Sequence, residues 1–160
     1  MKLIIFDLDN TLLDTTGQLD IILEGDINSI VPFPKTISVL ETIQKAGIPM
    51  ALVTFGVQER QLKKIEVLNI GHFFDDITIC EYPEEKQAAF EKLLEKYSSI
   101  DKKDIYIVGD RIDVEIMFGN MLGCTTVQMC FGKYVDLKPE NEFQIPKYKI
   151  HTIEEICQFV

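Results

Sequence analysis

The sequence has no long apolar run and no paired cysteines. Its first apolar stretch, Leu3–Phe6, ends at Asp7 and is far shorter than a signal peptide or a membrane span. The four cysteines lie at wide, irregular spacings, without a CxxC pair or a neighbouring histidine: Cys80, Cys124, Cys130 and Cys157. Metal-binding and disulfide frameworks are therefore disfavoured, and we expect a cytoplasmic protein with buried, reduced thiols and no membrane partner.

Basic residues are also scarce. The chain has 16 Lys and Arg but 26 Asp and Glu, which gives a formal net charge of -10. Nucleic acid polymers bind proteins through clustered Lys and Arg that displace counterions, so we expect no such partner. A small anionic substrate is compatible with this charge, because a metal ion and one or two local cations can reverse the field inside a pocket. The two histidines, His72 and His151, are isolated, and we expect them in surface or structural positions.

Short apolar runs rich in Ile and Val alternate with longer amphipathic stretches, a pattern typical of strand-helix-strand units in a parallel sheet. The predicted strands are Lys2–Phe6, Ile48–Val53, Ile77–Ile79, Ile105–Val108 and Thr125–Met129. The predicted helices are Thr36–Ala46, Gln58–Leu68, Glu84–Tyr97, Arg111–Leu122 and Ile153–Phe159. In the second of these helices, Leu62, Ile65 and Leu68 have the spacing of an apolar face. We predict a single α/β domain over residues 1–160, a Rossmann-like three-layer sandwich around a central parallel sheet of at least five strands.

Acidic and hydroxyl side chains follow three of these strands. The segment DLDNT begins at Asp7, Thr54 follows the second strand, and Asp110 follows the fourth. If the first strand runs on through Asp7 and Asp9, their carboxylates share one face and one pocket. Like charges about 4 Å apart repel by roughly 4 kcal/mol near a protein surface, so a phosphate ester could bind beside these acids only with a cation present. We therefore expect a metal ion, with Lys86 as a further cation.

These residues resemble the four ordered motifs of the haloacid dehalogenase superfamily. DLDNT, Thr54, Lys86 and the GDR of residues 109–111 agree with that pattern in order and in spacing. The resemblance continues through PFPKTISVLETIQKAGIPMALVTFG and GDRIDVEIMFGNMLGCTTV, whereas residues 14–31 and 133–147 match nothing in it. It implies a phosphatase of that superfamily, with a minimal cap and a bound Mg²⁺.

The resemblance also implies a role for each matching residue. Asp7 would attack phosphorus and form an aspartyl-phosphate, and Asp9 would be the general acid and base. Thr54 would hydrogen-bond a phosphoryl oxygen, and Lys86 would balance charge. Mg²⁺ would be bound by Asp7, the main-chain carbonyl of Asp9, and Asp110. Because dehalogenases of the superfamily lack an acid at position 9 and need no metal, Asp9 favours hydrolysis of a phosphate monoester.

One position departs from the superfamily pattern. The last motif usually carries a second acid, normally Asp, four or five residues beyond its first acid. Here Glu115 is the fifth residue after Asp110 and Asp113 is the third, so both are possible second acids, with Glu115 the closer fit. Either could instead be an acid in the first turn of a helix, where the helix dipole favours negative charge.

The space available for a cap is small. A four-helix cap needs roughly 45 residues, whereas residues 12–33 offer a short linker with at most one helix, over Leu19–Ile30. We expect an open pocket with Phe33, Phe55 and Arg111 near its mouth. Its substrate would be a small phosphate ester, or a bulky phosphorylated substrate that covers the site, unless a second subunit of a homo-oligomer does so.

Two other functions use similar residues. A phosphotransferase or mutase would form the same aspartyl-phosphate but needs a lid that excludes water. A non-catalytic phosphoacceptor or binding module, similar to a signalling receiver domain, would carry its phosphorylated Asp after the third strand, where this chain has Cys80 and Glu81. The residues therefore favour the Mg²⁺-dependent phosphatase.

Overall fold

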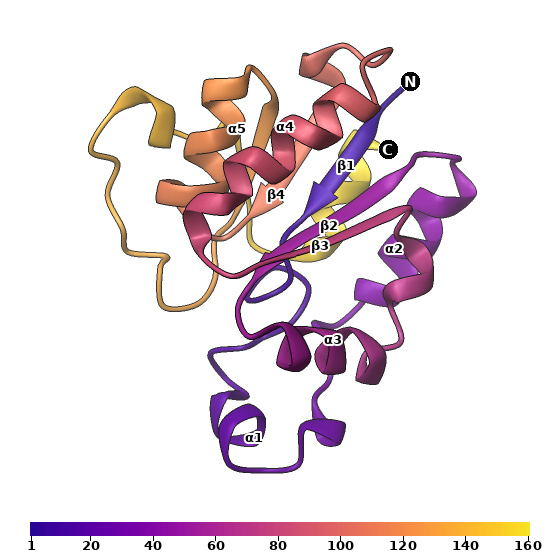
Figure 1. The fold of residues 1–160 in the computed structure, drawn as a ribbon, viewed down its shortest axis with the longest axis vertical. Coiled ribbons are helices and arrows are strands. Elements are labelled where there is room, and N and C mark those ends of the chain that lie inside the picture. The colour runs from indigo at the N-terminus through magenta and orange to yellow at the C-terminus, as the bar shows by residue number, and fades with distance from the viewer.

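The computed structural model describes residues 1–160 and contains one sheet of six parallel strands in the order β3-β2-β1-β4-β5-β6 (Figure 1). The strands are β1 Leu3–Phe6, β2 Met50–Phe55, β3 Asp76–Cys80, β4 Ile105–Gly109, β5 Thr125–Met129 and β6 Tyr148–Ile150. The predicted parallel sheet is confirmed. The sequence did not reveal β6, because this edge strand has three residues and two of them are exposed.

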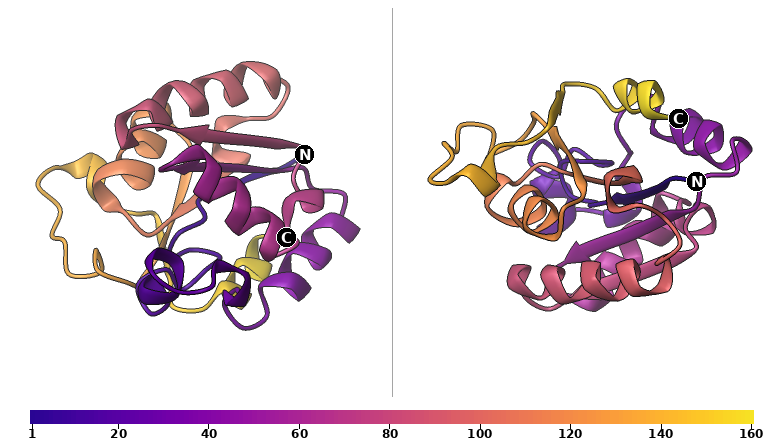
Figure 2. Two further views of the ribbon diagram at one scale, coloured as in Figure 1. Left: turned by 60° about the horizontal axis from the view of Figure 1, so that its bottom comes forward. Right: turned by 90° about the horizontal axis from the view of Figure 1, so that it is seen from above.

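Helices cover both faces of the sheet (Figure 2). They are α1 Leu19–Leu23, α2 Thr36–Lys45, α3 Gln58–Val67, α4 Lys86–Lys96, α5 Met117–Leu122 and a C-terminal 3-10 helix Ile153–Phe159. α2, α3 and the 3-10 helix pack on one face, and α4 and α5 pack on the other. The predicted three-layer sandwich is therefore confirmed. None of these helices has both the length and the apolar character needed to cross a membrane.

The central strand β1 explains how one short apolar run serves two layers. Side chains alternate across a strand, so Ile4 and Phe6 join the core on the α2 and α3 side, whereas Leu3 and Ile5 join the core under α4 and α5. All four are buried. Burial on both faces is the reason that a parallel strand has an unbroken apolar sequence. The buried strand also fixes the position of Asp7, which directly follows Phe6.

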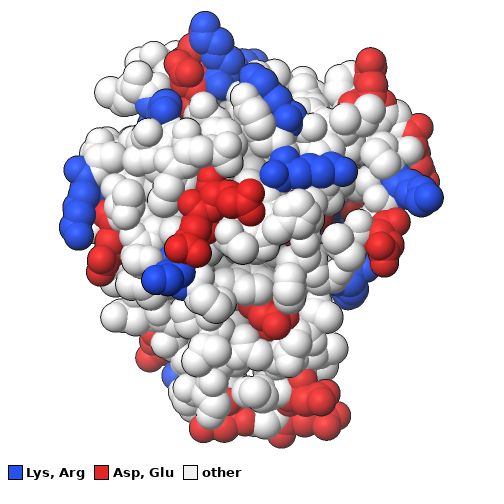
Figure 3. Space-filling view, turned by 180° about the vertical axis from the view of Figure 1, so that it is seen from behind, with Lys and Arg blue, Asp and Glu red and all other residues white.

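The segment between β1 and α2 contains less helix than expected. α1 ends at Leu23, and a 3-10 turn follows at Ile27–Ser29, so the prediction of one helix over Leu19–Ile30 is wrong. Gly25 disfavours helix continuation, and the carboxylate of Asp26 accepts a hydrogen bond from the Asn28 N–H (3.0 Å) at the start of the turn. Acidic side chains gather at the end of the molecule where α1 lies (Figure 3).

The cysteines and histidines have no shared site. All four thiols are free, and Cys80 and Cys124 are buried. Cys130 is half-buried and Cys157, in the C-terminal 3-10 helix, is exposed. The expected burial is therefore wrong for Cys157 and only partly met at Cys130. His72 and His151 are exposed, as the sequence indicated.

Gly119 allows α5 to approach the sheet closely. A Cβ at this position would lie 2.6 Å from Thr126 Cγ2 and 3.2 Å from Ile107 Cδ1. Alanine normally stabilises a helix relative to glycine by about 1 kcal/mol, but here the clash outweighs that gain. We predict that Gly119→Ala lowers the free energy of unfolding by about 1–2 kcal/mol in urea denaturation, whereas Met121→Ala, at an exposed position of α5, changes it by less than about 0.5 kcal/mol. A gain in stability in Gly119→Ala would contradict this packing.

Candidate active site

The carboxyl ends of β1, β2 and β4 bring three predicted site residues to one edge of the sheet. Asp7 follows β1, and its N–H donates to the carbonyl of Val108 in β4 (2.9 Å). Thr54 is in β2, on the other side of β1, and Asp110 follows β4. The connection after β1 runs to β2, whereas the connection after its neighbour β4 runs to β5 on the opposite side, and such a switch point produces a crevice at the strand ends in which ligands bind.

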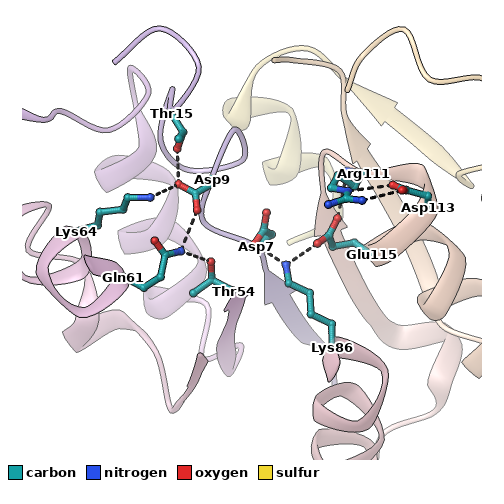
Figure 4. Close-up of polar contacts among 10 residues, drawn as sticks. All are labelled: Asp7, Asp9, Thr15, Thr54, Gln61, Lys64, Lys86, Arg111, Asp113 and Glu115. Carbon is teal, nitrogen blue, oxygen red and sulfur yellow. Dashed lines mark hydrogen bonds and ion pairs between the residues drawn. The ribbon is translucent and has the colours of Figure 1, made fainter. Parts of the chain in front are cut away.

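Lys86 links two of the acids in this crevice. It is the first residue of α4 and is fully buried. Its Nζ donates to Asp7 Oδ1 (2.7 Å) and to Glu115 Oε1 (2.5 Å) (Figure 4). Although burial opposes its charge, Asp7 and Glu115 raise the pKa of Lys86 above its ordinary value. The lysine is therefore a permanent cation at the base of the site.

One lysine does not neutralise the acids around it. Carboxylate oxygens of Asp7, Asp110 and Glu115 lie within 4.8 Å of one another, and all three residues are buried. Burial raises the pKa of Asp7 to about 7 despite Lys86. Burial, together with Asp7 and Glu115, raises the pKa of Asp110 to about 9. The three acidic groups outnumber the single ammonium group, so a divalent cation would balance their negative charge when they are ionised. The all-oxygen donor set fits Mg²⁺.

The two possible second acids have different surroundings. Glu115 is 1% exposed and lies in the acidic cluster. Asp113 instead accepts two hydrogen bonds from Arg111, at 3.0 and 2.7 Å. The predicted helix over 111–122 begins as a π-helix, Ile112–Ile116, and becomes α5 only at Met117. A Cβ on Gly109 would lie 2.4 Å from Glu115 Cγ, so the glycine before Asp110 makes room for Glu115.

Asp9 has hydrogen-bond partners different from those of Asp7. β1 ends at Phe6, and Asn10 adopts a left-handed conformation with φ of 56°. The strand therefore does not run on through Asp9, although Asp7 and Asp9 line one cavity. The carboxylate of Asp9 points toward α3, where it accepts hydrogen bonds from Lys64 Nζ (2.7 Å) and Gln61 Nε2 (2.9 Å). It also accepts one from Thr15 Oγ1, in the segment between β1 and α1. Although burial opposes it, Lys64 holds the pKa of Asp9 below its ordinary value.

The sequence did not identify Gln61 and Lys64 as site residues. They are buried, whereas Leu62 is 49% exposed, so the predicted apolar face of α3 is wrong at Leu62. The face toward the sheet is formed by Gln61, Lys64, Ile65 and Leu68, which are spaced i, i+3, i+4 and i+7. Two polar residues in that series were the signal that could have indicated their role.

A cavity of about 290 Å³ opens above these residues. It is lined by the carboxylates of Asp7, Asp9 and Asp110, and by Phe55 and Arg111, as expected for its mouth. Phe33 does not line it and packs edge-to-face on Phe131, with ring centroids 4.7 Å apart. Further walls are formed by three apolar side chains of α1, which are Leu19, Ile22 and Leu23. Lys133 and Tyr134 also line the cavity.

Solved structures support the fold. The fold is similar to that of HAD-hydrolase YfnB from Bacillus subtilis, a crystal structure bound to magnesium. The TM-score is 0.76 at 18% sequence identity, with 98% of this chain and 97% of that chain covered.

Sequence relatives are longer than this chain. It is 29% identical over 131 residues to the glyceraldehyde 3-phosphate phosphatase of Methanopyrus kandleri and 31% identical over 131 residues to that of Methanocaldococcus jannaschii. Each alignment covers 81% of this chain and 56% of the relative. The family model for haloacid dehalogenase-like hydrolases matches residues 18–129, a range that includes Thr54, Lys86, Asp110 and Glu115. The chain therefore belongs to the haloacid dehalogenase-like hydrolase family.

Proposed function

We propose that this chain is a Mg²⁺-dependent phosphatase that hydrolyses a phosphate monoester through an aspartyl-phosphate on Asp7. The observation that carries the proposal is the position of Asp7 at the end of β1. Asp7 is hydrogen-bonded to the buried Lys86 and lies beside two further buried acids, Asp110 and Glu115. A carboxylate attacks an anionic phosphate only where nearby cations offset the repulsion between them. Lys86 supplies one such cation, and the acidic cluster is suited to hold a second.

The hydrogen bonds support a proposed task for each side chain. Lys86 bonds to Oδ1 of Asp7, which leaves Oδ2 to attack phosphorus. Thr54 Oγ1 accepts a hydrogen bond from Gln61 Nε2 (2.7 Å), so its own proton is available for a phosphoryl oxygen. Asp9 in its protonated form gives a proton to the leaving oxygen in the first step, and its ionised form, which Lys64 favours, accepts one from water in the second.

The metal would be held by Asp7, the main-chain carbonyl of Asp9, and Asp110. Glu115 is the second acid that we propose to support it, since Asp113 is paired with Arg111. When bound, Mg²⁺ would neutralise the phosphoryl oxygens and the attacking carboxylate. Lys86 holds Asp7 in place, because its Nζ bonds to both Asp7 and Glu115.

The substrate that we propose is a small phosphorylated compound. The named relatives are glyceraldehyde 3-phosphate phosphatases, and a cavity of about 290 Å³ suits an ester of similar size. The test is release of inorganic phosphate from triose phosphates, glycerol phosphates and p-nitrophenyl phosphate, with Mg²⁺ and with a chelator. We expect Mg²⁺-dependent release from at least one ester. Absence of release from all of them in Mg²⁺ would refute the proposal.

Metal binding should also be visible in stability. Mg²⁺ at about 100 times its Kd adds about 2.7 kcal/mol of stability, and we expect Tm to rise by about 5–10 °C for a chain of this size. Asp110→Asn should abolish the rise, because it removes a ligand. It should also raise Tm at neutral pH without Mg²⁺, because it removes an acid whose ionisation burial disfavours. Thermal denaturation of wild type, Asp110→Asn and the exposed control Asp136→Asn measures both effects. An Mg²⁺-dependent rise in Tm that persists in Asp110→Asn would remove Asp110 from the metal site.

A further inference from the structure

We infer that Gln61 and Lys64 of α3 are positioning residues, which hold the Asp9 carboxylate and the Thr54 hydroxyl where these groups can act on a phosphate ester. This inference rests on the proposed function, and it assigns to α3 a part in the reaction. Neither side chain lies in the sequence motifs that resemble the superfamily. Both are buried, at 2% and 4% exposure for Gln61 and Lys64.

Gln61 connects two groups of the proposed mechanism. Its Nε2 donates to Asp9 Oδ2 (2.9 Å) and to Thr54 Oγ1 (2.7 Å), so both amide protons are used (Figure 4). The backbone at Gly56 also lies against this side chain. Gly56 has φ of 142°, and a Cβ there would lie 3.3 Å from Gln61 Cδ. A glutamine fixed in this way sets the distance between Asp9 and Thr54.

Lys64 gives Asp9 a cation of its own. Its Nζ lies 2.7 Å from Asp9 Oδ1, and Asp9 is the only carboxylate within 4.0 Å of it. Lys86 pairs with Asp7 and Glu115 instead. The site therefore contains two separate networks, one around Asp7 and one around Asp9, as Figure 4 shows.

Stability alone does not account for these two polar residues. A buried ion pair is generally no more stabilising than well-packed apolar side chains of similar volume. Gln61 and Lys64 stand at core positions of an otherwise ordinary amphipathic helix, where Leu or Met would pack against Ile65 and Leu68. The contact that each residue makes with Asp9 is therefore what would be lost if an apolar residue replaced it.

The chemistry predicts a specific kinetic signature. A general acid must lie within hydrogen-bonding distance of the leaving oxygen. A displaced Asp9 therefore slows the departure of an alkoxide, which needs a proton, but barely affects the departure of p-nitrophenolate, which needs none. A displaced Asp9 also slows the activation of water in the second step. With p-nitrophenyl phosphate, the phosphorylated enzyme would then accumulate after a rapid first turnover.

The experiment compares Lys64→Met with wild type on glycerol 1-phosphate and on p-nitrophenyl phosphate in saturating Mg²⁺, by stopped flow and in the steady state. We expect kcat for glycerol 1-phosphate to fall about 10- to 100-fold. The first turnover of p-nitrophenyl phosphate should change by less than about threefold and should end in a burst of about one p-nitrophenolate per chain. Gln61→Met should behave in the same way, and it carries the test if Lys64→Met does not fold.

The control is Lys63→Met, because Lys63 is the neighbouring lysine of α3 and pairs only with Glu66 on the surface (3.1 Å). It should match wild type on both esters. Equal losses on both esters without a burst, unchanged kinetics, or a gain in kcat in the Lys64→Met and Gln61→Met proteins would each overturn the positioning role. If wild type is inactive on every ester tested, the proposed function fails and this inference fails with it. Activity in wild type that is unaltered in both variants refutes the inference alone.

Discussion

Asp7→Asn should reduce phosphate release by at least about 10³-fold. The amide keeps the shape of the side chain but does not form an acyl phosphate, and Oδ1 can still accept the hydrogen bond from Lys86. The variant should therefore fold, and its Tm without Mg²⁺ should not fall, because the substitution removes a carboxylate whose pKa burial raises to about 7. Steady-state phosphate release with the best ester of the panel, together with Tm, measures both expectations.

The matched control for this change is Asp136→Asn, which alters the same functional group at an exposed position. It should retain wild-type kcat and KM. Residual activity of Asp7→Asn above about one tenth of wild type would exclude Asp7 as the nucleophile. Such a result would leave the fold and the family membership unaffected, since neither depends on the role of Asp7.

Lys86→Met should impair both stability and catalysis. Removal of the ammonium group leaves Asp7, Asp110 and Glu115 buried together without a cation. Loss of one partner of a buried ion pair costs about 3–5 kcal/mol, and we expect a loss of this size in urea denaturation without Mg²⁺. Mg²⁺ should restore part of it. kcat should fall by about 10²–10³-fold even in saturating Mg²⁺, because one cation at the reacting carboxylate is lost.

Lys92→Met is the control for Lys86→Met, since Lys92 is an exposed lysine of the same helix. Its free energy of unfolding should stay within about 0.5 kcal/mol of wild type. If Lys86→Met had wild-type stability in the absence of Mg²⁺, the acids would be neutralised by protons rather than by the lysine. The description of Lys86 as the cation at the base of the site would then be wrong.

The strand-end residues could be predicted from the sequence because two simple rules act there. Apolar runs buried on both faces identify parallel strands, and the carboxyl ends of parallel strands meet at one edge. These rules predict Asp7, Thr54 and Asp110 at the same edge, and the structure has them at the carboxyl ends of β1, β2 and β4. The resemblance to a family added Lys86, whose position in a helix alone gave no indication of burial.

Other features depended on contacts that a sequence pattern does not contain. The spacing of Lys64 could indicate that it faces the sheet, but only the structure shows that it lies beside Asp9. The π-helix at Ile112–Ile116 brings Glu115 under Lys86, but its sequence has the periodicity of an ordinary helix. The strand β6 has only three residues and little apolar character. In each case tertiary packing, rather than local preference, determined the structure.

The central claim is that Asp7 becomes phosphorylated. The most direct measurement uses Asp9→Asn, which should slow hydrolysis of the intermediate, with p-nitrophenyl phosphate as a substrate that needs no acid for its departure. After incubation with Mg²⁺, acid quenching and proteolysis, mass spectrometry should find one phosphoryl group on the peptide that contains Asp7. That group should be absent from the Asp7→Asn/Asp9→Asn double variant. A phosphoryl group on any other residue, or phosphate release by wild type with no phosphorylated Asp7 in the quenched Asp9→Asn protein, would contradict the proposed mechanism.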